Sequence, residues 1–240
     1  MKVRIKFSKY GAVKFIGHLD VMRYFQKAIR RAGIDIAYSE GFSPHQIMSF
    51  AAPLSVGHTS QGEYFDIELN SITSEEDIQK KLQSVMVEGF DILEVSILSE
   101  DAGNAMASVE AASYLVSFRE STLLPEGWQD KLKKFYEQPV ITVIKPTKKG
   151  EKEINLKESI YELQIVEDAK DAEGNPLGDS VYILLNASSG GNIKPAFVLE
   201  TFFQTLDFEP APFSMLIQRM ETYQNIGNNE ERKLVGLISS

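Results

Sequence analysis

Residues 1–38 read MKVRIKFSKYGAVKFIGHLDVMRYFQKAIRRAGIDIAY, and the spacing of their apolar side chains changes twice. Residues 2–8 alternate charged and apolar side chains, which is typical of a half-buried strand. Over residues 18–32 the apolar side chains recur three or four positions apart, which predicts an amphipathic helix that ends before Gly33. A short strand is expected at residues 34–38. The stretch therefore predicts a strand, a helix and a strand in succession.

The same order of elements continues along the chain. We expect an extended piece at 46–51, a strand at 63–69, a helix at 74–87 and a strand at 92–98, followed by a small, polar linker at 99–110. The order then recurs, with strands at 113–119, 140–145, 159–166, 181–185 and 214–223 and helices at 127–137 and 195–206. This order predicts an α+β fold, a tandem pair of ferredoxin-like (βαββαβ) halves. The expected domains are 1–100 and 111–225, with a flexible tail at 226–240.

Charge is distributed unevenly along the 240 residues. The chain has a net charge of −9, but residues 1–60 contain nine Lys/Arg and three Asp/Glu, a net of +6, which leaves −15 on the remainder. The overall charge argues against indiscriminate binding to nucleic acid. A basic N-terminal region in an otherwise acidic chain instead predicts an anionic partner at one end of the protein.

Composition also excludes several classes of protein. The chain has no cysteine, so it cannot supply a thiol nucleophile, a disulfide or the thiolates of an iron–sulfur cluster. No apolar run approaches the roughly 20 residues of a membrane helix, and the N-terminus lacks the apolar core of a signal peptide. We expect a cytoplasmic protein with no membrane contact.

The helix at 18–32 places four cations on the side opposite its apolar stripe: Arg23, Lys27, Arg30 and Arg31. Such a run is often only a solvated face. Here the cations fall within one arc, and the helix contains no Glu to pair with them, so contact with phosphate or an acidic partner is an equal alternative. Two further cations, Arg4 and Lys6, are expected to lie beside Asp66 and Glu68 on a neighbouring strand and to be neutralised there.

Residues 39–60 form a loop-rich segment that carries Ser43, His45 and His58, and His18 lies at the start of the preceding helix. Histidine is a common metal ligand and acid–base group. The spacing of the three histidines matches no compact metal motif, so we expect no metal site and no cofactor. General acid–base catalysis and simple anchoring of the loop by hydrogen bonds both remain open, and anchoring is the simpler reading.

A second glycine-rich segment, SSGGNIKP at 188–195, precedes the helix at 195–206. Backbone N–H groups at a helix N-terminus can bind an anion, and Lys194 would add positive charge. A tight turn between strand and helix explains the same residues, and we favour that reading because both the dinucleotide-binding fingerprint and the P-loop pattern are absent.

The run GHLDVMRYFQKAIRRAGIDIAYSEGFSPHQIMSFAAPLSVG, continuing into GEYFDIEL, resembles the radical-SAM-linked proteins, which are bacterial proteins encoded beside or fused to a radical SAM enzyme. The resemblance is specific over about residues 7–70. It includes Phe15, His18, Asp20, Arg23, Arg31, Ser39, Gly41, Phe42, Pro44, His45, Pro53, Leu54, Gly57, Glu63, Tyr64 and Asp66. The loop reads Pro44-His45-Gln46 where the family commonly has Pro-His-Pro.

The resemblance implies a partnership with a radical SAM enzyme in the modification of RNA or of a ribosomal protein. Because this chain has no cysteine, it could serve only as the accessory. We therefore expect a non-catalytic binding module whose contact surface combines the basic helix and the loop. The alternative is a metal-independent RNA-processing enzyme of tandem ferredoxin-like type, with His18 or His45 as general acid or base. A third reading is a purely structural domain with an apolar patch around Phe42, Ile47 and Phe50.

Overall fold

The structure is a computed structural model that describes residues 1–71, 74–119, 123–147, 150–171, 175–228 and 231–238. The chain divides into two compact units. The first comprises residues 1–110 and 219–240, and the second comprises residues 111–218. No helix within the described ranges is both long and apolar enough to cross a membrane.

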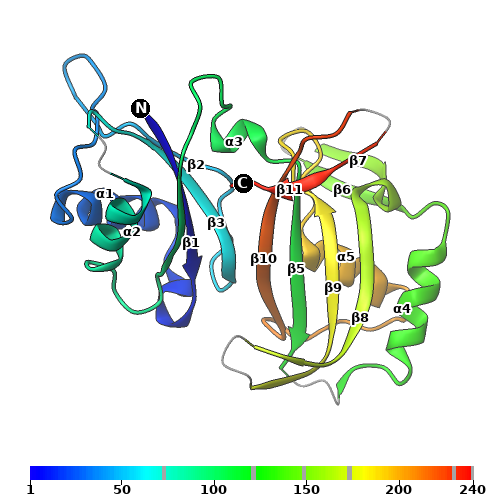
Figure 1. Ribbon diagram of the computed structural model, residues 1–240. Coiled ribbons are helices and arrows are strands. Elements are labelled where there is room, and N and C mark those ends of the chain that lie inside the picture. Colours follow the sequence, from blue (N-terminus) through cyan, green and yellow to red (C-terminus); the bar gives the residue numbers. More distant parts are fainter. Residues whose placement is uncertain (72–73, 120–122, 148–149, 172–174, 229–230, 239–240) are drawn as a thin grey trace. The chain divides into compact units, whose positions relative to one another are not determined.

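The first unit is a sheet with two helices on one face (Figure 1). Its elements are β1 (Lys2–Lys9), η1 (Gly11–Phe15), α1 (His18–Arg31), β2 (Met48–Phe50), β3 (Thr59–Glu68), α2 (Glu75–Gln83), β4 (Ile92–Ile97), α3 (Ala105–Ser108), the later residues of β10 (Met215–Asn225) and β11 (Leu234–Gly236). The strand order is β4-β1-β3, and both β2 and β10 neighbour β3. The pairs β1–β3, β1–β4 and β2–β3 are antiparallel.

The core of the first unit lies between the sheet and its two helices. Alternation along β1 turns Val3, Ile5 and Phe7 towards α1 and α2, as the sequence predicts, and each is at most 1% exposed. The ring of Phe7 packs edge-on against Phe25 of α1, with 4.7 Å between ring centroids. Apolar burial on this face fixes the position of α1 and leaves its opposite face outward.

Two expectations for the first unit need correction. Residues 34–38 do not form a strand; they make only single bridges, from Ile36 to Leu69 and from Tyr38 to Gln46. The linker at 99–110 is ordered, because it contains α3 and hydrogen-bonds to the sheet: the carbonyl oxygen of Gly103 accepts from Arg4, and Ala105 N donates to Asp66. Small polar residues thus serve close packing here, where the composition indicated a spacer.

The C-terminal residues are part of the first unit. Strand β11 pairs antiparallel with β10, and Leu237 is 2% exposed. The flexible tail expected from residue 226 is replaced over these residues by a strand and a buried leucine. At Gly62, β3 approaches β10 so closely that a Cβ atom would lie 2.5 Å from the Cα atom of Glu221. This contact requires glycine.

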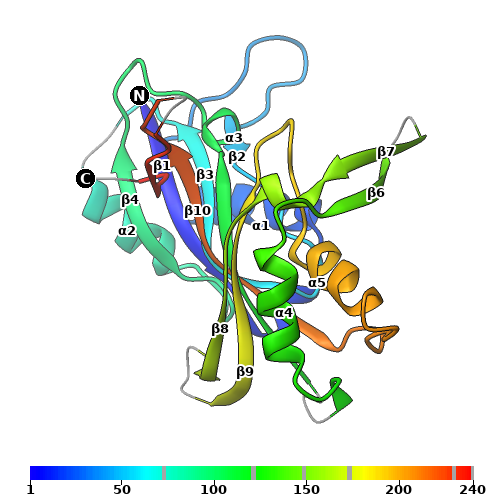
Figure 2. The ribbon, with the colours of Figure 1, turned by 90° about the vertical axis from the view of Figure 1, so that its right-hand side faces the viewer.

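The second unit repeats the pattern of a sheet with helices (Figure 2). It contains β5 (Ala111–Phe118), α4 (Trp128–Glu137), β6 (Thr142–Thr147), β7 (Gly150–Asn155), η3 (Leu156–Ser159), β8 (Ile160–Lys170), β9 (Pro176–Asn186), α5 (Pro195–Gln204) and the first residues of β10. The strand order is β10-β5-β9-β8, and β6 and β7 form a separate hairpin. Its core includes Trp128, Leu132, Phe202 and Phe203. Part of the lysine-rich turn of that hairpin, residues 148–149, lies outside the described residues.

Candidate functional site

Helix α1 presents a row of cations to solvent. Arg23, Lys27 and Arg30 are separated by four and three residues, so they lie along one line of the helix, and all three are exposed. The buried side of the same helix is apolar. We call these three residues the α1 row. It is the part of the predicted basic face that remains available to a partner.

The four predicted cations differ in what they contact. Arg23 forms an exposed ion pair with Asp20 at 3.5 Å, a pairing that the sequence analysis did not anticipate and that stabilises little in water. The side chains of Lys27 and Arg30 form no ion pair or hydrogen bond with another described residue. Arg31 is engaged: its Nη2 donates to the carbonyl oxygen of Val85 at 3.3 Å, just beyond α2, and its guanidinium lies 5.8 Å from the centre of the Tyr24 ring. Arg31 therefore links two helices.

The segment between α1 and β2 is a closed loop, residues 38–46, which we call the Phe42 loop. Ser39 N donates to the carbonyl oxygen of His45 at 2.8 Å. The Ser39 hydroxyl accepts from His45 N at 3.1 Å and lies 2.8 Å from His45 Nδ1. Gly41 has a φ of +107°, a conformation that favours glycine. These bonds close the base of the loop, which projects from the first unit in Figures 1 and 2.

Phe42 lies at the tip of this loop and is fully exposed. Its neighbours Glu40, Gly41, Ser43 and Pro44 are also exposed. The apolar patch considered for a purely structural domain does not form as expected, because Phe50 is buried in the core and Ile47 is half-buried. The whole aromatic ring of Phe42 is therefore accessible to a partner.

Gln46 ties the Phe42 loop to α1. Its Nε2 donates to the carbonyl oxygen of Gln26 at 3.1 Å and lies 3.5 Å from the hydroxyl of Tyr38. Gln46 is 6% exposed, and its Oε1 is buried without a hydrogen-bond partner among the described residues. Gln26 is three residues from Arg23 and four from Arg30, so the base of the loop adjoins the α1 row. Tyr38, Gln26 and Gln46 were not among the predicted site residues.

His18, His45 and His58 contact three different residues, and none of these three contacts joins two histidines. The ring of His18 packs edge-on against Phe50, with centroids 5.2 Å apart. His45 is exposed and bonded to Ser39. His58 is half-buried before β3, and its backbone N–H donates to Ser55. In the described part of the chain, no group of three or more His, Cys, Asp or Glu side chains is arranged to hold a metal ion. The acid–base role for His18 or His45 stays a prediction.

Several charged residues of the sheet are withdrawn from solvent: Arg4 and Asp66 are buried, and Lys6 is half-buried. Arg4 forms two hydrogen bonds with the carboxylate of Asp66, at 2.8 and 3.0 Å, as predicted. Lys6 pairs instead with Glu221 of β10, 215 positions away, and Glu68 lies opposite Lys2. The expectation that Asp66 and Glu68 neutralise both cations is therefore wrong for Lys6.

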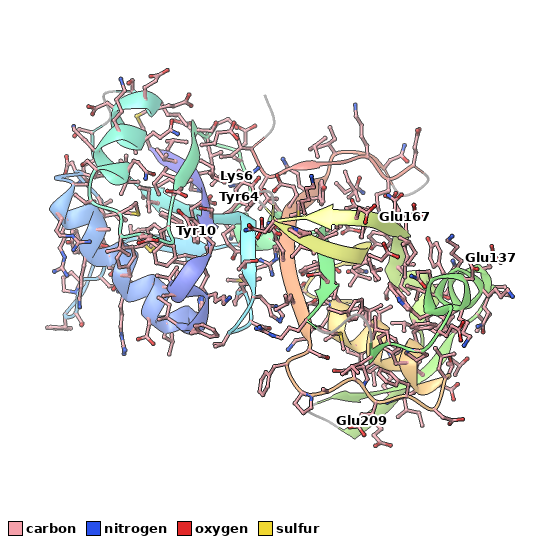
Figure 3. The ribbon with its side chains drawn as sticks, turned by 90° about the horizontal axis from the view of Figure 1, so that it is seen from below. Lys6, Tyr10, Tyr64, Glu137, Glu167 and Glu209 are labelled. Atoms are coloured by element: carbon pink, nitrogen blue, oxygen red, sulfur yellow. The ribbon has the colours of Figure 1, made fainter. Side chains whose placement is uncertain are left out.

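Tyr64 lies beside Lys6 on the adjacent strand (Figure 3). Its hydroxyl donates to Glu221 Oε1 at 2.8 Å. Burial, reinforced by the negative charge of Glu221, raises the pKa of the Tyr64 phenol well above its ordinary value. Because its ring is 2% exposed, Tyr64 is not a stacking surface for a ligand.

Lys194 belongs to the second unit. Its side chain is exposed at the start of α5. Two residues earlier, the carbonyl oxygen of Asn192 accepts a hydrogen bond from Lys145 Nζ at 2.7 Å. Ser188 and Asn186 hydrogen-bond to each other within the glycine loop. These contacts are consistent with a tight turn between strand and helix. The candidate site of the first unit does not include Lys194.

Comparisons with known proteins place the chain in one family. No reviewed protein is significantly similar to this sequence. The structure of the first two RRM domains of the yeast poly(U)-binding protein Pub1 aligns with 91% of this chain and 98% of its own, at 11% identity and a TM-score of 0.21. A TM-score this low supports no statement about fold or function. Residues 2–195 match the family described as "Uncharacterized protein conserved in bacteria (DUF2344)", and the chain belongs to that family.

Proposed function

We propose that this protein is a non-catalytic accessory module that binds an anionic partner through the α1 row and the Phe42 loop. One observation carries the proposal: three exposed cations, Arg23, Lys27 and Arg30, lie in one line beside a closed loop that exposes Phe42. A local basic surface on a chain of net charge −9 favours one oriented contact over general attraction to anions.

The partner that we propose is a radical SAM enzyme acting on RNA or a ribosomal protein. Support for this comes from the sequence resemblance over residues 7–70, which contains both the α1 row and the Phe42 loop. The division of labour is consistent with composition, because this chain lacks the cysteines that ligate an iron–sulfur cluster.

We also propose that each unit is a ferredoxin-like βαββαβ module. In the first unit the strand order β4-β1-β3-β2 with α1 and α2 on one face supports this assignment. In the second, the order β10-β5-β9-β8 supports it once β6 and β7 are treated as an inserted hairpin. A ferredoxin-like module leaves the outer faces of its helices free, which is where the α1 row lies.

Charge reversal tests the proposed surface. The variant carries Arg23→Glu, Lys27→Glu and Arg30→Glu, and the matched control carries Lys131→Glu, Lys133→Glu and Lys134→Glu on the exposed side of α4. Binding is measured by calorimetry against the purified radical SAM enzyme encoded nearest the gene of this chain, at two salt concentrations. We expect salt-sensitive binding that the α1 variant abolishes and the α4 control retains. Equal binding by both variants would overturn the surface assignment.

A further inference from the structure

We propose that the surface formed by the α1 row and the Phe42 loop binds single-stranded nucleic acid, with Phe42 stacking on a base. This inference rests on the proposed function and adds to it a nucleic-acid ligand for the same surface, of the class on which the proposed partner enzyme acts. It differs from a general anion site because it requires both a row of cations and an exposed aromatic face.

The α1 row provides the contact to phosphates. From Arg23 to Arg30 the helix rises about 10 Å, and successive phosphates of a stacked strand advance roughly 3.4 Å along the strand axis. Lys27 and Arg30 have no described partner that would have to be displaced. Arg23 is paired only with exposed Asp20, a weak interaction that a phosphate can replace. The row can therefore follow a short length of sugar–phosphate backbone.

The Phe42 loop provides the contact to bases. Phe42 is fully exposed and Tyr38 is 48% exposed, one at the tip and one at the base of the same loop. The loop is already closed by the bonds between Ser39 and His45 and is held against α1 by Gln46. Ordering of the loop therefore precedes binding, which lowers the entropy lost when a base stacks on either ring.

The surroundings of Phe42 favour a base over a protein side chain. The centre of a protein interface is a dry, apolar area that surrounds its aromatic anchor. Phe42 instead is flanked by exposed Glu40, Gly41, Ser43 and Pro44, of which only Pro44 adds an apolar ring. A base needs only one ring face, and the α1 row at the base of the loop can hold phosphates of the same strand. Bases in a duplex are already stacked on one another, so the surface favours a single strand.

Fluorescence anisotropy with labelled dodecamers tests this assignment. The probes are U12 RNA, dT12 DNA, a 12-base-pair RNA duplex and unlabelled heparin as a competitor without bases. We expect U12 or dT12 to bind more tightly than the duplex, and the comparison of U12 with dT12 identifies the preferred sugar. Phe42→Ala and Phe42→Leu should each weaken binding roughly five- to a hundredfold, whereas Phe42→Trp should retain it.

One matched control and one measurement of salt dependence complete the test. Phe213→Ala removes a phenylalanine of the second unit that is 90% exposed, and it should leave affinity unchanged. The α1 charge reversal should make the salt dependence weaker: the negative slope of log K against log salt should decrease in magnitude by about 2, since three phosphate contacts contribute about 0.7 each. Circular dichroism of each variant confirms folding, which these exposed positions should not disturb.

The outcomes separate this inference from the proposed function. No binding of either dodecamer at low salt, or equal binding by Phe42→Ala and the unaltered protein, overturns the single-strand assignment. If the α1 reversal still abolishes the complex with the radical SAM enzyme in that case, the accessory function stands and the surface binds the enzyme without binding nucleic acid. Equal affinity for the duplex and the single strand also overturns base stacking.

Discussion

Gln46 donates a hydrogen bond from its Nε2 to the carbonyl oxygen of Gln26, 3.1 Å away, and thereby joins the Phe42 loop to the middle of α1. This bond places the base of the loop next to the α1 row. It uses a backbone acceptor within a helix, and it leaves the other amide atom, Oε1, buried without a partner among the described residues.

Gln46→Ala should loosen the loop with little cost to the fold. The hydrogen bond to Gln26 and the longer one to Tyr38 are lost, but an unsatisfied buried oxygen is removed as well, so the free energy of unfolding should change by only about 1 kcal/mol. Amide hydrogen exchange over residues 38–46 should become faster, and the affinity for U12 should fall. Gln138→Ala, at an exposed position after α4, is the control. Unchanged exchange in the loop would show that Gln46 does not hold it.

Gly62→Ala should destabilise the first unit by about 2–4 kcal/mol. An added Cβ atom would lie 2.5 Å from the Cα atom of Glu221, which is backbone and cannot move aside without separating β3 from β10. Urea unfolding followed by circular dichroism measures the change. Gly190→Ala is the control, because a Cβ atom there meets no atom within 4 Å. Similar stabilities for the two variants would contradict the close approach of the strands.

Arg4 and Asp66 should behave as a coupled pair. Arg4→Met leaves a buried carboxylate without its guanidinium, and Asp66→Leu leaves a buried guanidinium without its carboxylate, so each should cost about 3–5 kcal/mol. The double variant should cost clearly less than the sum of the single changes, because neither charge remains unpaired. A double-mutant cycle from urea unfolding gives this coupling. Additive costs would mean that the pair contributes nothing beyond its separate contacts.

Leu237→Ala tests whether the C-terminal residues complete the first unit. Leu237 is 2% exposed and its carbonyl oxygen accepts from Arg4 Nη1 at 3.0 Å. Removing the buried side chain should cost about 2–5 kcal/mol in the free energy of unfolding. Ile226→Ala, at a position 54% exposed, should cost far less. Equal small losses would restore the expectation of a flexible tail.

Tyr64 should make stability fall in alkaline solution. Its pKa is raised in the folded protein by burial and by Glu221, whereas in the unfolded chain it titrates near its ordinary value of about 10. The unfolded state therefore loses the proton first, so the stabilisation is complete below about pH 10 and is lost as the pH rises through that value and above it. The free energy of unfolding of the unaltered protein, measured from pH 8 to 11, should decline relative to Tyr64→Phe.

Lys9 contributes the opposite slope in the same experiment. Burial lowers the pKa of its ammonium group, with Glu63 opposing that shift. Between that lowered pKa and about 10.4 the unfolded chain holds more protons than the folded one, so stability rises with pH in that window. Subtracting the Tyr64→Phe curve from that of the unaltered protein cancels the Lys9 contribution. Parallel curves for the two proteins would contradict the assigned pKa shift of Tyr64.

Local pattern was sufficient for much of the fold. The alternation in β1 and the helical spacing in α1 predict both elements to within a residue or two, since each reflects which side chains one face must bury. The pairing of Arg4 with Asp66 also followed from strand order. The position of the α1 row on the outer face was predictable for the same reason.

Contacts between distant parts of the chain were not predictable in this way. Glu221 neutralises Lys6, Leu237 accepts from Arg4, and Gln46 fastens the Phe42 loop to Gln26. None of these contacts produces a periodic pattern in the sequence, because each depends on where the backbone turns and not on which face a residue occupies. Sequence thus determined the cations and the aromatic ring of the candidate surface. Long-range hydrogen bonds, which form only after the sheet and helix have packed, determined that the base of the Phe42 loop adjoins the α1 row.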